Sequence, residues 1–130
     1  MAWNSFRDLE VWQMGRQLVR DVYELSDKFP AKEQFGLTSQ IRRSAVSIPA
    51  NIAEGHGRRL DGAFTQFLRI ASGSLNEVET LVILAIDVEI ISESEASGVL
   101  DAIPKLSVKI SNLISTLGKV VREEPAIYNP

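Results

Sequence analysis

The chain has 130 residues, of which 45% are hydrophobic and 24% charged, a composition typical of one globular domain and unlike that of disordered or collagen-like chains. It contains no cysteine, which excludes disulfides, thiolate metal sites and thiol nucleophiles. Its formal net charge of −3 disfavours a protein whose whole surface binds a polyanion, but leaves room for a local basic patch.

The first predicted element is a helix over about 8–29. Its apolar residues recur at steps of three and four, the spacing that places them on one helical face. They are Val11, Met14, Leu18, Val22, Leu25 and Phe29. A second stripe between Pro30 and Gly55 predicts the next helix. It consists of Leu37, Ile41, Ala45, Ile48 and Ile52.

Pro49 lies inside this second predicted helix. Because proline cannot donate a backbone hydrogen bond and its ring crowds the preceding turn, we expect a kink there, with two shorter helices as the alternative. Asn51 and Glu54 are expected to bond backbone groups freed by Pro49 and by the helix end. Gly55 and Gly57 predict that end, with the turn requiring a positive φ.

The third predicted helix begins after Asp61 as its N-cap. Its stripe consists of Phe64, Leu68, Ala71, Leu75, Val78, Val82 and Ala85. The fourth begins at Ser92 or Ser94, and Pro104 is expected to bend its first turns. Its stripe consists of Val99, Ile103, Leu106, Ile110, Leu113, Leu117 and Val120. Four helices with short connections predict an all-α, antiparallel up-down-up-down four-helix bundle over 1–122, followed by a flexible tail over 123–130.

Three of these helices carry a second apolar row beside the core stripe. One interpretation is a broad core stripe, and the other is a self-association surface, since exposed apolar rows favour contact with further copies. The candidate interface residues are Trp12, Val19, Tyr23, Ile70, Leu81, Leu84 and Val88. The fourth helix has a similar row at Leu100, Ile114 and Val121.

The sequence contains none of the common catalytic or metal-binding patterns. The single histidine, His56, lies beside only one nearby carboxylate in the sequence, Glu54, and a lone imidazole–carboxylate pair is a poor metal site. The chain contains no Glu-x-x-His pair, no Gly-x-Ser-x-Gly elbow and no phosphate-binding glycine loop. We therefore expect no metal, no cofactor and no enzymatic activity.

Basic charge is concentrated in the middle of the sequence. Between Thr38 and Asn76 five arginines accompany two acids, whereas nine acids and four bases follow from Glu77 onward. The five arginines are Arg42, Arg43, Arg58, Arg59 and Arg69. Arginine binds phosphate bidentately, so these residues are candidates for one nucleic-acid-binding zone on the hairpin of helices two and three. Alternatively, they pair with acids of the same or a neighbouring subunit.

No segment predicts a membrane span or a secretory signal. The longest unbroken apolar run, 81–86, is far shorter than the roughly 20 residues that cross a bilayer. The first eight residues lack the apolar region of a signal peptide. We therefore expect a cytoplasmic protein that contacts no membrane.

Four sequence strings together resemble the bacterial 23S rRNA intervening-sequence protein family. They are FRDLEVW at 6–12, FPAKEQFGL at 29–37, QIRRSAVSIPANIAEG at 40–55 and ASGSLNE at 71–77. The resemblance spans about 6–120 and implies a four-helix bundle that assembles as a homopentamer without enzymatic activity. The family is also similar to the accessory variability determinant of diversity-generating retroelements, a pentamer that binds nucleic acid and a reverse transcriptase.

These observations lead to two hypotheses. In the first, the protein is a non-enzymatic, homopentameric scaffold that binds RNA, DNA or a nucleic-acid-processing partner. In the second, it is a protein–protein adaptor with no nucleic-acid role, which its acidic total charge and extra apolar rows favour. Pro49, Asn51, Glu54 and Gly55 are expected to act mainly in the structure of helix two.

Overall fold

The structure, a computed structural model, describes residues 4–123, with side chains described for residues 4–119. Four long helices follow one another: α1 (Glu10–Ser26), α2 (Leu37–Gly57), α3 (Asp61–Asp87) and α4 (Glu93–Glu123). Two short 3-10 helices, η1 (Phe6–Asp8) and η2 (Ala31–Glu33), precede α1 and α2. The described residues include no strand, and the predicted all-α four-helix bundle is confirmed.

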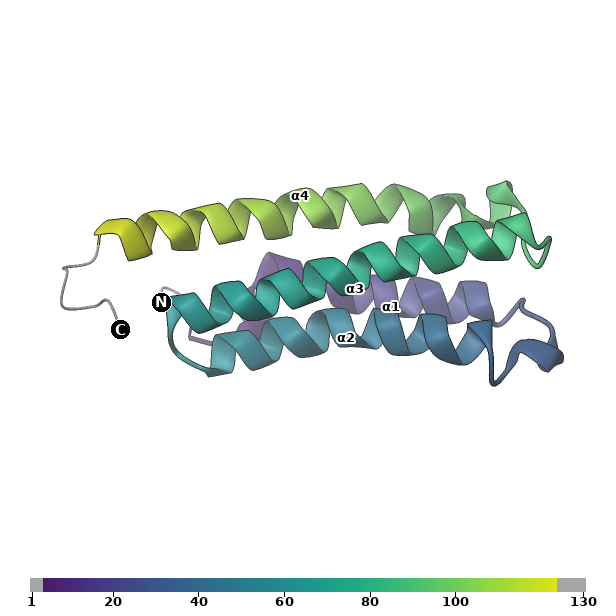
Figure 1. The fold of residues 1–130 in the computed structure, drawn as a ribbon, viewed down its shortest axis with the longest axis horizontal. Coiled ribbons are helices and arrows are strands. Elements are labelled where there is room, and N and C mark those ends of the chain that lie inside the picture. The colour runs from purple at the N-terminus through teal and green to yellow at the C-terminus, as the bar shows by residue number, and fades with distance from the viewer. Residues whose placement is uncertain (1–3, 124–130) are drawn as a thin grey trace.

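The helices surround one core as a ring of four neighbours. α1 packs against α2 and α4, and α3 packs against the same two helices. Figure 1 shows that the four helices lie along one axis and that consecutive helices run in opposite directions. The predicted tail lies outside the described residues, apart from Glu123 at the end of α4.

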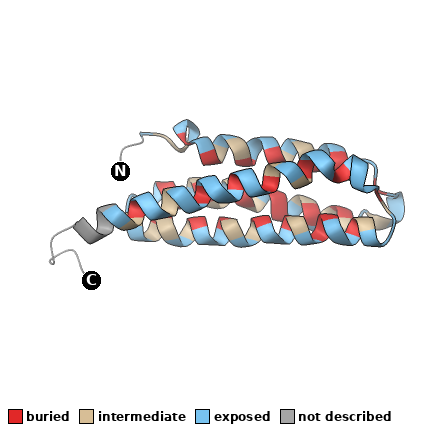
Figure 2. Cartoon of the chain, turned by 90° about the horizontal axis from the view of Figure 1, so that it is seen from above, coloured by how far each residue is buried: buried red, intermediate tan, exposed pale blue. Residues whose placement is uncertain are grey.

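The predicted apolar stripes form the core. Figure 2 shows buried positions recurring along each helix, separated by exposed ones, as expected when one face of each helix packs inward. All seven stripe residues of α3 are buried. Met14, Leu37 and Leu113 are half-buried at the edges of their stripes, and the side chain of Val120 lies outside the described part. The spacing of apolar residues thus identified the core correctly.

α2 and α3 make an especially close contact, which depends on small residues. A Cβ atom added to Gly55 would lie only 2.5 Å from the Cβ of Phe67 and 3.1 Å from the Cδ1 of Phe64. Further along the contact, the hydroxyls of Ser47 and Ser74 share a short hydrogen bond. Glycine and serine therefore allow the two backbones to approach.

α2 continues through Pro49 as one helix, so the alternative of two shorter helices is wrong, whereas the predicted kink stays a prediction. Gly15 of α1 lies against this turn of α2: a Cβ added there would lie 3.3 Å from the Cγ2 of Ile48, a tight contact, and 3.5 Å from the Cδ of Pro49, an ordinary one. Asn51 donates its side-chain amide to the carbonyl of Ser47 at 2.7 Å. The missing N–H of Pro49 frees the carbonyl of Ala45, not that of Ser47, so Asn51 bonds a different backbone group from the expected one, although within the turn that contains the proline.

The turn after α2 differs from the prediction, and the turn after α3 uses the same kind of residue. No glycine in the described residues has a positive φ; Arg59 and Glu89, both at φ 62°, take the left-handed conformation instead. Gly55 and Gly57 lie inside α2, so the explanation by positive φ was wrong. After α3, Glu89 donates to the Ile86 carbonyl and Ile90 to the Ala85 carbonyl, the pattern of a Schellman C-cap.

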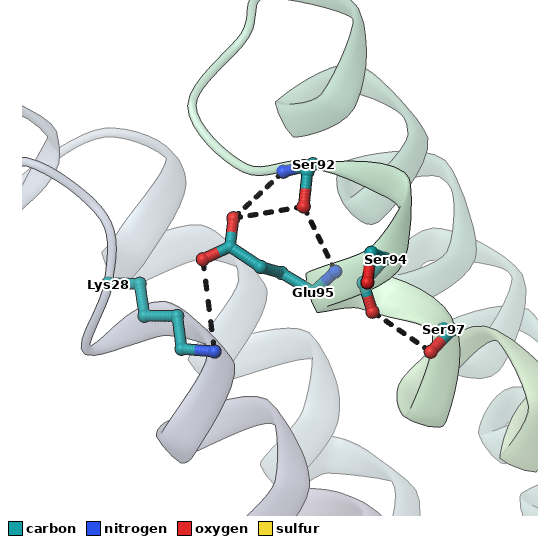
Figure 3. Close-up of polar contacts among 5 residues, drawn as sticks. All are labelled: Lys28, Ser92, Ser94, Glu95 and Ser97. Atoms are coloured by element: carbon teal, nitrogen blue, oxygen red, sulfur yellow. Dashed lines mark hydrogen bonds and ion pairs between the residues drawn. The ribbon is translucent and has the colours of Figure 1, made fainter.

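The start of α4 is capped reciprocally, as Figure 3 shows. The hydroxyl of Ser92 accepts the backbone N–H of Glu95 at 3.1 Å, and the Glu95 carboxylate accepts the backbone N–H of Ser92 at 2.9 Å. This backbone hydrogen bond lowers the pKa of Glu95, against the opposing effect of desolvation. Lys28 approaches the same carboxylate at 3.9 Å. Ser92 is therefore the cap, whereas Asp61 is not a cap but the first residue of α3.

The close contact at Gly55 predicts that Gly55→Ala destabilises the bundle, because the new methyl group overlaps Phe67. Overpacking of this kind costs about 1–3 kcal/mol of unfolding free energy. Gly57→Ala is the matched control, since an added Cβ there has no atom within 4 Å and alanine favours helix by up to about 1 kcal/mol. Chemical denaturation followed by circular dichroism measures both, and equal stability of the two variants would contradict the contact.

Candidate functional site

Among the described residues, the buried polar ones are Ser26, Thr38, Ser44 and His56. His56 is only 2% exposed, and its ring packs almost perpendicular to the ring of Phe64, with the two ring centroids 5.9 Å apart. Within residues 4–123, no group of three or more histidine, aspartate or glutamate side chains could hold a metal ion. Within the same residues, no helix combines the length and apolarity that a bilayer crossing requires. The candidate sites are therefore surfaces.

Arg42, one of the five candidate arginines, is engaged inside the protein. Its Nε donates to the hydroxyl of Ser26 at 2.7 Å, and a terminal nitrogen lies 2.8 Å from the Asp27 carboxylate. The guanidinium also stacks over the ring of Tyr23, 4.5 Å from its centroid. Arg42 of α2 thus binds the C-terminal end of α1, where a cation is favourable to the helix dipole.

Arg58 is also engaged, at the other end of α2. Its guanidinium lies 3.2 Å from the Glu54 carboxylate and 5.2 Å from the ring centroid of Phe67. Glu54 therefore pairs with an arginine one turn later, which corrects the expectation that it bonds freed backbone groups. Since the pair is half-exposed, it contributes little stability.

The five arginines do not form one zone. Arg42 and Arg43 lie sixteen residues before Arg58 and Arg59, which at about 1.5 Å per residue separates the two pairs by about 24 Å along α2. α2 and α3 are neighbours, as predicted. In such a hairpin, only those residues of the two helices that lie near the turn are close to the turn and to one another. Arg43, Arg59 and Arg69 are exposed. Arg58, Arg59 and Arg69 lie toward the end of the bundle that holds the α2–α3 turn, whereas Arg42 and Arg43 lie toward the other end.

The candidate interface residues have different environments. Ile70, Leu84 and Val88 are 50%, 44% and 60% exposed, so they form an apolar surface on and just beyond α3. Leu81 is only 4% exposed, which corrects its assignment to that surface. α3 packs against both α2 and α4, and its buried arc is wide enough to include this residue.

On α1, the predicted row is largely occupied by contacts within the chain. Trp12 packs edge-on against Phe6 with ring centroids 5.1 Å apart, and Arg16 stacks over it at 5.5 Å. Trp12 and Val19 are half-buried and pack against the core. Tyr23 is 41% exposed but lies under Arg42. The free apolar surface therefore belongs mainly to α3.

A hollow of about 540 Å³ lies between α2 and α3 beside this apolar surface. Its lining includes Arg43, Ser44 and Glu77, and the Ser44 hydroxyl donates to the Glu77 carboxylate at 2.5 Å. Phe35 also lines it and is 92% exposed. The sequence analysis did not identify Phe35, because this residue lies between helices and belongs to no periodic apolar stripe. The one signal in the sequence is a large apolar residue beside the turn-forming residues Pro30 and Gly36.

Comparison with protein families gives a match over most of the chain. A family model described as 23S rRNA-intervening sequence protein matches residues 7–112, which include α1, α2, α3 and most of α4. No curated protein matches the chain.

The contacts of Arg42 predict a structural role that Arg43 does not share. Arg42→Met should lower the unfolding free energy by about 1–3 kcal/mol, because it removes charge-assisted hydrogen bonds to the end of α1. Arg43→Met, at an exposed position, should change it by less than about 0.5 kcal/mol. Thermal and urea denaturation test the pair, and a stable Arg42→Met protein would show that the guanidinium contacts are not structural.

Proposed function

The chain belongs to the 23S rRNA-intervening sequence protein family, and from that premise we propose that it is a non-catalytic scaffold that assembles with copies of itself. The observation that carries this proposal is the apolar surface of Ile70, Leu84 and Val88, which the single chain leaves exposed. Apolar side chains of this size, left in water on one helix, favour a protein contact. The resemblance of the sequence to the family favours five copies in a ring.

The geometry of α3 supports a helix-to-helix contact between copies. Ile70, Glu77 and Leu84 follow each other at intervals of seven residues, the repeat by which helices pack side by side. Glu77 interrupts the apolar line, but its carboxylate is bonded to Ser44 of the same chain. A neighbouring copy would therefore contact Ile70 and Leu84, which lie about 21 Å apart along α3. Between them it would meet Glu77, whose carboxylate is already bonded to Ser44.

Phe35 supports the same face. It is 92% exposed and lines the hollow between α2 and α3, beside the α3 surface. An aromatic ring in this position buries a large apolar area when a second chain covers it, and such rings often dominate interface energies. The hollow and the projecting ring together provide concave and convex features on the face that we propose contacts a neighbouring copy. In a ring of five this face would contact a different face of the neighbour, because the contacts in a ring are heterologous.

Ile70→Glu and Leu84→Glu should weaken or abolish assembly, since each places a charge in the proposed contact without disturbing the core. Val108→Glu is the control, because Val108 is 57% exposed on α4, away from this face. Size-exclusion chromatography with light scattering gives the mass of each variant. A monomeric parent protein at micromolar concentration would refute self-association, and a dimer or tetramer would refute only the ring of five.

A nucleic-acid role is the second candidate, and the exposed arginines near the α2–α3 turn favour it. Arg59 lies in the turn and Arg69 on the exposed side of α3. In a ring of identical chains, these groups recur once in each copy, so that a weak site gains effect by repetition. Because the net charge of each chain is −3, attraction would act only at short range.

Arg59→Glu combined with Arg69→Glu should reduce RNA retention at low salt while leaving assembly intact. Each lost phosphate contact lowers the slope of log affinity against log salt by about 0.7 for a single strand. The control is Arg20→Glu with Lys32→Glu, an equal change of charge at the other end of the bundle. No retention by the parent protein at low salt, or equal retention by both double variants, would contradict an RNA site at this turn.

A further inference from the structure

The opposite flank of α3 carries a second groove, between α3 and α4 near the start of α4. Its volume is about 370 Å³. The apolar part of its lining consists of Ile83, Ile86 and Leu100, of which Ile83 is 46% exposed and the other two are half-buried. Ile83 and Leu84 are adjacent in sequence but about 100° apart around the helix, so this groove is separate from the proposed self-association face.

The rim of this groove is acidic. Asp87, Glu93 and Asp101 line it and are exposed. The four ion pairs in the described part of the chain involve Asp27, Glu54, Glu10 and Glu95, and none of the three rim carboxylates. From Glu77 to Pro104 the sequence has seven acids and no lysine or arginine. The next base, Lys105, lies one helical turn after Asp101 and takes part in none of the four ion pairs.

From the apolar floor and the acidic rim, we propose that the α3–α4 groove binds a basic amphipathic helix of another protein. Its apolar side chains at positions i, i+3 or i+4 and i+7 would contact Ile83, Ile86 and Leu100, as in other helix-in-groove contacts. Its lysines and arginines would lie beside Asp87, Glu93 and Asp101. Carboxylates on both walls, Asp87 on α3 and Asp101 on α4, favour an occupant that carries bases along both edges of its apolar face.

Charge complementarity distinguishes this occupant from the alternatives. A nucleic acid is disfavoured, because its phosphates would face three carboxylates. A purely apolar segment would leave those carboxylates partly desolvated without partners. If a second copy of this chain occupied the groove, variants of the groove would change the mass of the assembly, which can be measured. The proposal does not depend on the self-association face, which lies on the other flank of α3.

The test uses the full chain in its native assembly and a fluorescein-labelled synthetic helix of 18 residues, with leucine at i, i+3, i+4 and i+7 and lysine beside them. Fluorescence anisotropy should show saturable binding that weakens with salt. Asp87→Asn, Glu93→Gln and Asp101→Asn together should weaken it about tenfold, from three lost partial ion pairs. Ile83→Ser should weaken it by a similar factor, whereas Val46→Ser, at an exposed position of α2, should not.

The matched control removes three carboxylates elsewhere: Asp8→Asn, Asp21→Asn and Glu24→Gln together change the net charge equally. Binding within about twofold of the parent is expected for this control. Equal weakening by both triple variants, or no saturable binding, would overturn the proposal. A change of assembly mass in the groove variants would assign the groove to a second copy and would also overturn it. Leu84→Glu separates the two proposals, since it should change the assembly mass and leave peptide binding intact.

Discussion

The close approach of α2 to α3 is the constraint on which the rest of the bundle depends. It requires Gly55, where any side chain would overlap Phe67, and small hydroxyl residues at Ser47 and Ser74. Because these residues supply little apolar area, the contact is held by hydrogen bonds on its outer side and by the larger core residues on its inner side. Both helices must keep this register, since Ser44 meets Glu77 only in one alignment.

That register also determines what α3 leaves exposed. α3 packs against α2 on one flank and α4 on the other, and its core stripe lies between them. Leu84 on one flank and Ile83 on the other remain 44% and 46% exposed. The two apolar surfaces thus belong to one helix but have different surroundings: a hollow containing Arg43 and bonded serine hydroxyls on the α2 side, and unpaired carboxylates on the α4 side. Different surroundings favour different partners.

The arginines show how tertiary structure divides residues that are alike in sequence. Arg42 and Arg43 are adjacent, yet Arg42 reaches Ser26 and Asp27 across the α1–α2 contact, while Arg43 lies at the rim of the α2–α3 hollow. Arg58 stacks on Phe67 and pairs with Glu54, whereas Arg59 is exposed in the turn. In each pair, one arginine is engaged with side chains of its own chain, whereas among the described residues no such contact is found for the other, which is exposed.

The sequence alone determined the helical class, the four elements and nearly all of the core. Burial along a helix follows from the spacing of apolar residues within that helix, which can be read from one segment of the sequence. Tertiary structure alone decided that Leu81 is buried and that Glu89 and Arg59, not glycines, form the turns. It also decided that Gly15 lies against Ile48 and Pro49 and that the arginines lie in separate places. These outcomes depend on distances between residues far apart in the chain, which the spacing within one helix does not specify.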